Sequence, residues 1–371
     1  MTASFAQDIQ STESETPETA PGTSQLANVL TSHAVVRVAA KSKDEPDSDE
    51  EPAEEETEAI NDEELDLLED FPDETYELEL IHSRIANLAP LRLPRFGPYL
   101  QKLCLRQNQI AHLEPDIFHH LTNLDELDFY DNKIKHVGRA LDKLDKLTVL
   151  DLSFNNIRTI PDALQTLSSL KTVYFVQNRI SKISGLENLT NLTSIELGGN
   201  KIRRIENLDA LVNLEELWLG KNKISRLENL GSLKKLRILS IQSNRITKLE
   251  GLEELESLEE LYISHNGIQK IEGLEKNTKL TTLDIGNNFI KELENVSHLT
   301  SLEELWMSNN EIPDLRGLEP QLKHIKTLTT LYLEGNPCQK TDVANYRRKI
   351  QLALPQLKQI DATFTRAGAL P

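Results

Sequence analysis

The sequence predicts an α/β solenoid in which about twelve repeats of 22 residues stack behind one parallel sheet. The frame L-x-L-x-x-N-x-I recurs from residue 103 onward, and an opening unit at 78–85 has Ser83 in the asparagine place. Six successive intervals between the asparagines are 22 residues long, a register that a chance pattern does not hold. The recurring residues are Asn108, Asn132, Asn155, Asn178, Asn200, Asn222, Asn244, Asn266, Asn288, Asn310 and Asn336.

Each fixed position of this frame has a physical reason. Strand residues alternate between two faces, so both leucines point into the solenoid and the residue between them points outward. The asparagine follows where the strand turns away, and its amide pairs with backbone groups that the turn leaves unpaired. The period and the frame are those of the leucine-rich repeat. We therefore expect a parallel concave sheet, a convex side of short 3-10 or helical segments, and a helical cap at the C-terminal end.

Acidic residues dominate the N-terminal part of the chain. Residues 44–74 hold 18 Asp or Glu and no Lys or Arg, which accounts for nearly all of the net charge of −19. So charged a segment buries too little apolar surface to offset the entropy lost on ordering. We expect residues 1–74 to form a largely disordered tail. A short capping helix near its end would place Leu65, Leu68 and Phe71 on one side.

The C-terminal segment predicts the helical cap. Thr341 or Asp342 is a candidate N-cap and Pro355 a stop. An apolar stripe at helical spacing lies between them, formed by Val343, Tyr346, Ile350 and Leu354. The predicted organisation is a tail at 1–74, a leucine-rich-repeat solenoid at 75–338 and a cap at 339–371.

The composition of the chain indicates in which cellular compartment the protein is expected. No run of 18 apolar residues is present, so we expect no membrane span. The first residues lack a basic stretch followed by an apolar one, which argues against a secretory signal. Cys104 and Cys338 are too few for a disulfide framework, and we interpret both as reduced thiols. We expect the protein in the nucleus and the cytoplasm.

Catalytic motifs are missing from the sequence. The nine histidines are scattered, and no HxxxH, CxxC, GxSxG or glycine-rich phosphate loop occurs. We therefore expect a protein that is not an enzyme, with no cofactor and no metal site.

The outward residue of each L-x-L triplet forms a column on the concave side. Five of its twelve members are aromatic, in a chain that is 5% aromatic, and five are acidic. Large aromatic side chains beside fixed charges favour a protein-binding surface, because aromatics bury much area and charges exclude wrong partners. The column is Glu79, Cys104, Asp128, Asp151, Tyr174, Glu196, Trp218, Ser240, Tyr262, Asp284, Trp306 and Tyr332.

The segment KTVYF at 171–175 fits a short Lys/Arg-x-Val-x-Phe docking peptide for type-1 phosphatase. In the repeat frame, however, Val173 and Phe175 are the two inward residues of one unit. We expect both to be buried, and the segment to have no docking role.

The chain resembles the leucine-rich-repeat regulatory subunit of type-1 serine/threonine protein phosphatase. The resemblance covers about residues 75–366 and is carried by the stretches NLEELWLGKNKI and SHNGIQKIEGLE and by the ending YLEGNPCQKTDVANYRRKIQLALPQLKQIDATF. It implies that acidic and aromatic concave residues hold the catalytic subunit of the phosphatase. The matching positions are Asp151, Tyr174, Glu196, Trp218, Asp284, Glu304, Trp306 and Tyr332.

Other partners and other classes of protein stay open at this point. A further disordered phosphatase inhibitor is a possible third component. An acidic nuclear leucine-rich-repeat adaptor, binding histones or RNA-processing proteins, would also explain the charged tail. Direct nucleic-acid binding is not expected, because the column contains no Lys or Arg.

Overall fold

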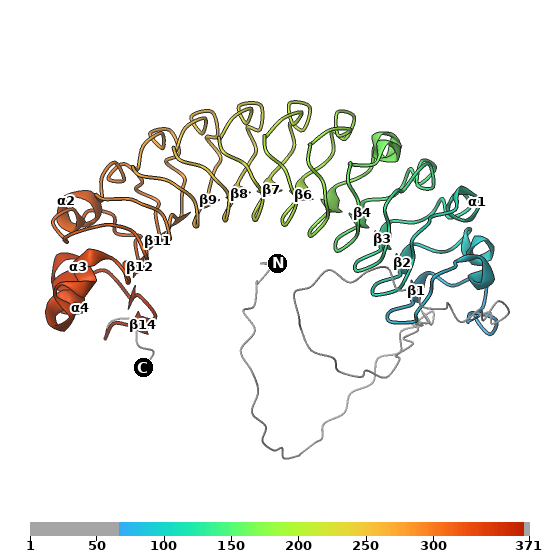
Figure 1. The fold of residues 1–371 in the computed structure, drawn as a ribbon, viewed down its shortest axis with the longest axis horizontal. Coiled ribbons are helices and arrows are strands. Elements are labelled where there is room, and N and C mark those ends of the chain that lie inside the picture. The colour runs from blue at the N-terminus through green and yellow to red at the C-terminus, as the bar shows by residue number, and fades with distance from the viewer. Residues whose placement is uncertain (1–66, 367–371) are drawn as a thin grey trace, which may run out of the picture. The chain divides into compact units, whose positions relative to one another are not determined.

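The computed structural model describes residues 67–366, which form a single sheet of strands coiled into a solenoid. Neighbours in the sheet follow the order of the chain, from β1 to β14. The strands of the repeats are β1 Glu77–Glu79, β2 Lys102–Cys104, β3 Glu126–Asp128, β4 Val149–Asp151, β5 Thr172–Tyr174, β6 Ser194–Glu196, β7 Glu216–Trp218, β8 Ile238–Ser240, β9 Glu260–Tyr262, β10 Thr282–Asp284, β11 Glu304–Trp306 and β12 Thr330–Tyr332. Figure 1 shows these strands along the inner side of an arc. The predicted leucine-rich-repeat solenoid is confirmed.

Alternation between the two faces of each strand builds the core. In β11, Leu305 is fully buried while Glu304 and Trp306 on either side are half-buried on the concave face. All strands from β1 to β12 pair in parallel with no shift of register, so the buried leucines of neighbouring repeats stack in one continuous core.

The convex side carries turns and short helical segments, as expected. Helical segments occur at η1 Ala89–Leu91, η2 Leu93–Phe96, α1 Pro115–Phe118, η3 Asp162–Thr166 and α2 Leu318–Leu322. All five lie in repeats longer than 22 residues, where the extra length lets the connector close a helical turn before it returns to the sheet.

A ladder of asparagines ties the repeats together. The Nδ2 atom of Asn222 donates to the carbonyl of Leu219 in its own repeat (3.0 Å) and to that of Leu197 in the preceding repeat (2.9 Å). Its Oδ1 accepts from the amide of Ile202 (3.0 Å). The same three contacts recur from Asn108 to Asn336. The asparagines are therefore structural, as the sequence indicated.

The residue before each asparagine adopts the left-handed backbone conformation. Lys221 has a φ of 53° and Asn309 a φ of 54°. In the last repeat the position is Gly335, where an added Cβ would lie 2.0 Å from Oδ1 of Asn309. This conformation turns the chain out of the sheet at the same point in every unit.

At the N-terminal end, residues 67–70 form turns rather than the expected helix, and the rest of that predicted helix lies outside the described residues. Leu68 is fully buried in the core, and the partly buried Phe71 packs against this core. The end of the acidic segment thus contributes an apolar side chain to the first repeat.

The C-terminal cap contains α3 Pro337–Lys340 and α4 Val343–Ala353. It also adds β13 Gln359–Ile360, parallel to β12, and β14 Thr363–Phe364, antiparallel to β13. Tyr346, Ile350 and Leu354 are buried as predicted, but the inclusion of Val343 in the apolar stripe is wrong, since Val343 is 71% exposed. It occupies the first position of α4 after Asp342, before the helix reaches the core. No helix in residues 67–366 is long and apolar enough to cross a membrane.

Candidate functional site

The concave column consists of the last residue of each strand from β1 to β12, the set expected from the sequence. The parallel pairing aligns its members across the sheet. Tyr174 lies in register with Asp151 on one side and Glu196 on the other, and Trp306 with Asp284 and Tyr332. Adjacent members are therefore about 4.8 Å apart at the backbone, and the column is one continuous surface.

An acidic group occupies β3 to β6. Asp128, Asp151 and Glu196 are half-buried carboxylates with Tyr174 between the last two. Burial, with the charge of Asp151 adding to it, raises the pKa of Asp128 to about 6 and that of Glu196 to about 6. Burial also raises the pKa of Asp151. Asp128 already has a cation beside it, since Arg106 contacts it at 3.2 Å. A cation of a partner would stabilise the ionised forms of Asp151 and Glu196 in the same way, so the group suits a basic partner surface.

The aspartates of the column also have a local structural role. Oδ1 of Asp151 accepts from the amide of Ser153 (2.8 Å), and Oδ1 of Asp128 accepts from that of Tyr130 (2.8 Å). Asp284 makes the same contact with Gly286 (3.1 Å). These bonds satisfy the amide two residues on, where each strand ends. The other oxygen of Asp128, Oδ2, accepts from the guanidinium of Arg106 (3.2 Å).

An aromatic group occupies β9 to β12. The ring of Trp306 lies between the rings of Tyr262 (centroids 6.1 Å apart) and Tyr332 (6.0 Å). Asp284, on the strand between Tyr262 and Trp306, is 9% exposed, and burial raises its pKa. Of the predicted partner-binding residues, Asp284 is thus the most enclosed. Trp306 itself is half-buried by its neighbours.

Glutamates on the same strands hold the aromatic rings. Trp306 donates from Nε1 to Oε2 of Glu304 (3.0 Å), and the hydroxyl of Tyr262 donates to Oε2 of Glu260 (2.7 Å). In both cases the acid stands two residues earlier and therefore on the same face of the sheet. Rings fixed in this way lose little further rotamer freedom when a partner binds.

Trp218 stands between the two groups. It ends β7, is half-buried, and lies in register with Glu196 of the acidic group and with Ser240 on β8. The eight predicted partner-binding residues thus all lie on the concave face, Asp151, Tyr174 and Glu196 together at one side and Asp284, Glu304, Trp306 and Tyr332 together at the other. That they bind a partner stays a prediction.

The predicted partner-binding residues do not include Tyr262 or the pair formed by Tyr130 and Phe154. Tyr262 completes the aromatic group, and its signal was the triplet Glu-Leu-aromatic at 260–262, the same as at 304–306. Tyr130 and Phe154 lie just after β3 and β4 with ring centroids 4.8 Å apart, and Phe154 is 40% exposed. They fall at variable positions of the frame, so the repeat pattern gave no signal for them.

The KTVYF segment has the predicted placement. Val173 and Phe175 are fully buried in the core of their repeat. Neither side chain is accessible to a docking groove on another protein.

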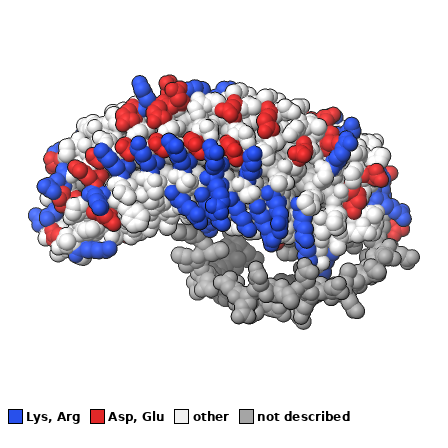
Figure 2. Space-filling view, turned by 45° about the horizontal axis from the view of Figure 1, so that its top comes forward, with Lys and Arg blue, Asp and Glu red and all other residues white. Residues whose placement is uncertain are grey.

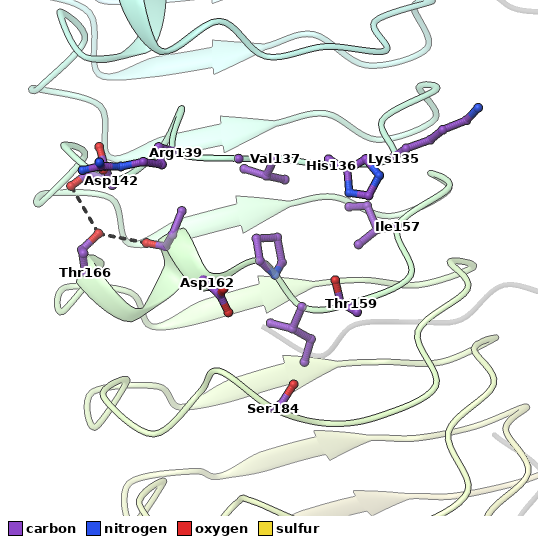
Figure 3. Close-up of a pocket in the computed structure, with 14 residues that line it drawn as sticks. Lys135, His136, Val137, Arg139, Asp142, Ile157, Thr159, Asp162, Thr166 and Ser184 are labelled. Atoms are coloured by element: carbon purple, nitrogen blue, oxygen red, sulfur yellow. Dashed lines mark hydrogen bonds and ion pairs between the residues drawn. The ribbon is translucent and has the colours of Figure 1, made fainter.

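A cavity of about 750 Å³ lies outside the concave column. Its lining residues include Lys135, His136, Thr159, Asp162 and Ser184, which come from the connectors that follow β3, β4 and β5 (Figure 3). Figure 3 shows Thr166 bonded to two carbonyls at its rim, to those of Asp142 (3.2 Å) and Ala163 (2.9 Å). The polar groups come from separate loops and form no nucleophile–base pair that would indicate catalysis.

Among the described residues, no three or more His, Cys, Asp or Glu side chains are placed to hold a metal ion. Burial raises the pKa of both thiols, Cys104 and Cys338, to about 11. Neither is therefore activated as a nucleophile at neutral pH.

Comparison with known proteins agrees with the fold. The family model described as leucine-rich repeat matches residues 98–157, and the model described as two copies of leucine-rich repeats matches 145–186, 168–210, 212–254 and 256–298. Among solved structures, an internalin from Listeria monocytogenes superposes with a TM-score of 0.62 at 25% identity, covering 78% of this chain and 87% of that one. A leucine-rich-repeat protein from Leptospira interrogans superposes with a TM-score of 0.63 at 27% identity, covering 77% and 75%. The chain belongs to the leucine-rich-repeat family.

Similar sequences narrow the resemblance within that family. Protein phosphatase 1 regulatory subunit SDS22 of Saccharomyces cerevisiae is 48% identical over 96 residues, covering 26% of this chain and 28% of the yeast protein. A protein phosphatase 1 regulatory inhibitor subunit homolog of Arabidopsis thaliana is 38% identical over 137 residues, covering 36% and 40%. An adenylate cyclase of Schizosaccharomyces pombe is 37% identical over 127 residues, covering 32% of this chain and 7% of the cyclase. The matches thus span less than half of each relative. They confirm the resemblance to the leucine-rich-repeat regulatory subunits of protein phosphatase 1.

Proposed function

We propose that the protein is a non-catalytic regulatory subunit that binds the catalytic subunit of type-1 serine/threonine protein phosphatase through its concave column. One observation carries the choice of surface. The fixed rings around Trp306 and the acidic group around Glu196 lie on the same face, in register, with Trp218 between them. The names of the yeast and Arabidopsis relatives support the choice of partner.

The aromatic group and the acidic group would have different roles in binding the partner. The aromatic group supplies area that is desolvated on binding and held in place beforehand, which is how interface anchors contribute affinity. The acidic group attracts a basic surface and fixes the orientation of the partner. A second, disordered inhibitor of the phosphatase would join such a complex as a third component. We place the complex in the nucleus and the cytoplasm.

Purified proteins test this proposal. The variant Glu196→Arg/Trp306→Ala removes one residue from each group, and we expect its affinity for the phosphatase catalytic subunit to fall at least 100-fold. The control is Glu256→Arg/Val212→Ala, which makes the same charge reversal and truncates an apolar side chain at exposed positions between strands. Both variants should melt within about 2 °C of the wild type. Equal affinity of the two variants would place the partner on another face.

A further inference from the structure

Two rows of basic side chains follow the flank of the solenoid where the chain leaves the strands. Figure 2 shows Lys and Arg gathered there in a continuous band. The outer row is paired with acids of the next repeat. Arg204 contacts Glu228 (3.1 Å), and Arg226 contacts Glu250 (2.7 Å). The geometry of the flank therefore allows an ion pair wherever the next repeat has an acidic residue at the matching position.

The inner row lacks such acids, and we call it the basic flank. Each of its members stands one or three residues after a ladder asparagine, and all but the half-buried Lys223 are exposed. Within residues 67–366, no carboxylate lies within 4.0 Å of their charged nitrogens, in contrast to the outer row. The members are Lys133, Lys135, Arg158, Arg179, Lys201, Arg203, Lys223 and Arg245.

Like charges on neighbouring repeats repel each other. Arg179, Lys201, Lys223 and Arg245 occupy the same position in four consecutive repeats, and the strands of those repeats are about 4.8 Å apart. Cross-strand pairs of like charge are destabilising. A row of this length therefore favours an anionic occupant that runs along it, across several repeats.

The same chain contains an anionic segment of suitable length. Residues 44–66 hold 14 Asp or Glu and no Lys or Arg, while residues 75–371 carry equal numbers of acidic and basic residues. This segment joins the solenoid directly at Leu68, which is buried in the core at the first repeat. Because the two are parts of one chain, the effective concentration of this segment at the flank is on the order of millimolar.

The distances permit the contact. A chain of 23 residues spans up to about 80 Å when extended. The strands β1 and β8 are seven intervals apart, roughly 34 Å along the sheet. Residues 44–66 can therefore start at the first repeat and reach every member of the basic flank.

We propose that residues 44–66 bind the basic flank of their own solenoid. The contact neutralises the inner row, so other acidic polypeptides would have to compete with residues 44–66 for it. It does not depend on the phosphatase, since the flank lies outside the concave column. Because exposed charges are screened by salt, the contact weakens as ionic strength rises.

Zero-length carbodiimide cross-linking of the full chain tests the proposal. The reagent joins a lysine to a carboxylate only when the two are in contact, so Lys201 and Lys223 serve as reporters. Peptide mass spectrometry should find both linked to acids within 44–66 at 50 mM salt, with at least a tenfold lower yield at 500 mM. The variant Arg158→Glu/Arg179→Glu/Arg203→Glu/Arg245→Glu keeps both lysines and should lower the yield at least tenfold.

A variant with the same change in net charge is the control. Lys143→Glu/Lys276→Glu/Lys279→Glu/Lys326→Glu alters exposed lysines outside the flank and should leave the yield within twofold of the wild type. Melting temperatures establish that both variants fold. Missing links in the wild type, or equal yields in the two variants, would overturn the proposal. In an equimolar mixture of ¹⁴N- and ¹⁵N-labelled molecules, links of which about half join unlike labels would also overturn it, because the occupant would then be a second copy.

Discussion

Tyr262 and Trp306 lie two strands apart, and their rings meet across the strand between them, with centroids 6.1 Å apart. Asp284 occupies that intervening strand and is 9% exposed. The two rings thus shield a carboxylate in the middle of the concave face. Glu304 and Glu260 bond the polar atoms of the rings, so the arrangement is formed before any partner arrives.

This arrangement makes Trp306 the expected anchor of the concave face. Trp306→Ala removes the central ring of the aromatic group and should cost about 2–4 kcal/mol of phosphatase binding, as truncation of an anchor does. Most of the loss should appear in the dissociation rate, because an apolar side chain contributes little to steering. Surface plasmon resonance measures both rates. Phe289→Ala, which removes a 51% exposed ring after the neighbouring asparagine, is the control and should bind normally.

The asparagine ladder predicts a stability difference between adjacent residues. Asn155 donates from Nδ2 to the carbonyl of Phe129 (2.9 Å) and accepts at Oδ1 from the amide of Ile134 (2.9 Å), whereas Asn156 is half-exposed beside it. Asn155→Ala leaves buried backbone groups unpaired and should lower the free energy of unfolding by about 1–3 kcal/mol. Asn156→Ala should change it by less than about 0.5 kcal/mol. Urea denaturation measures both, and similar losses would contradict the structural role of the ladder.

The repeat frame made the fold predictable from the sequence. One triplet and one asparagine, repeated in register, determine which residues are buried, which face the concave side and where each strand ends. Leu305, Trp306 and Asn310 accordingly lie where the pattern placed them. The pattern also placed Val173 and Phe175 in the core, although they fit a docking motif.

Features that depend on contacts between repeats were not predictable in the same way. The half-burial of Trp306 depends on the rings of Tyr262 and Tyr332 on other strands, and the enclosure of Asp284 follows from it. Exposure of Val343 depends on where α4 meets the core. Strands β13 and β14 contain two residues each, too few to show an alternating pattern.

The N-terminal end offers another pair of adjacent residues. Leu68 is fully buried, while Leu67 is 37% exposed. Leu68→Ala should lower the free energy of unfolding by about 2–5 kcal/mol, with the first repeats most affected because each repeat contacts only its neighbours. Leu67→Ala should have an effect below about 1 kcal/mol. Hydrogen exchange at β1 and β2 measures the local effect, and equal protection in the two variants would mean that Leu68 does not close the end of the solenoid.

The raised pKa of Glu196 predicts how binding depends on pH. Its pKa of about 6 in the free protein lies above the usual value near 4, because it is buried and close to Asp151 and Glu216. The native state therefore binds this proton more tightly than the unfolded state. The associated stability is present below about pH 4 and is lost as pH rises through 6.

Binding should follow the opposite trend. A basic partner requires the ionised form, so affinity should be constant above pH 7 and about tenfold weaker at pH 5 through Glu196 alone. Titrations at fixed ionic strength between pH 5 and 7.5 measure this change. The partner also titrates, so the informative quantity is the ratio of wild-type affinity to that of Glu196→Gln, in which titration of the partner cancels. We expect this ratio to shrink as pH falls toward 5, and a ratio independent of pH would show that Glu196 faces no cation in the complex.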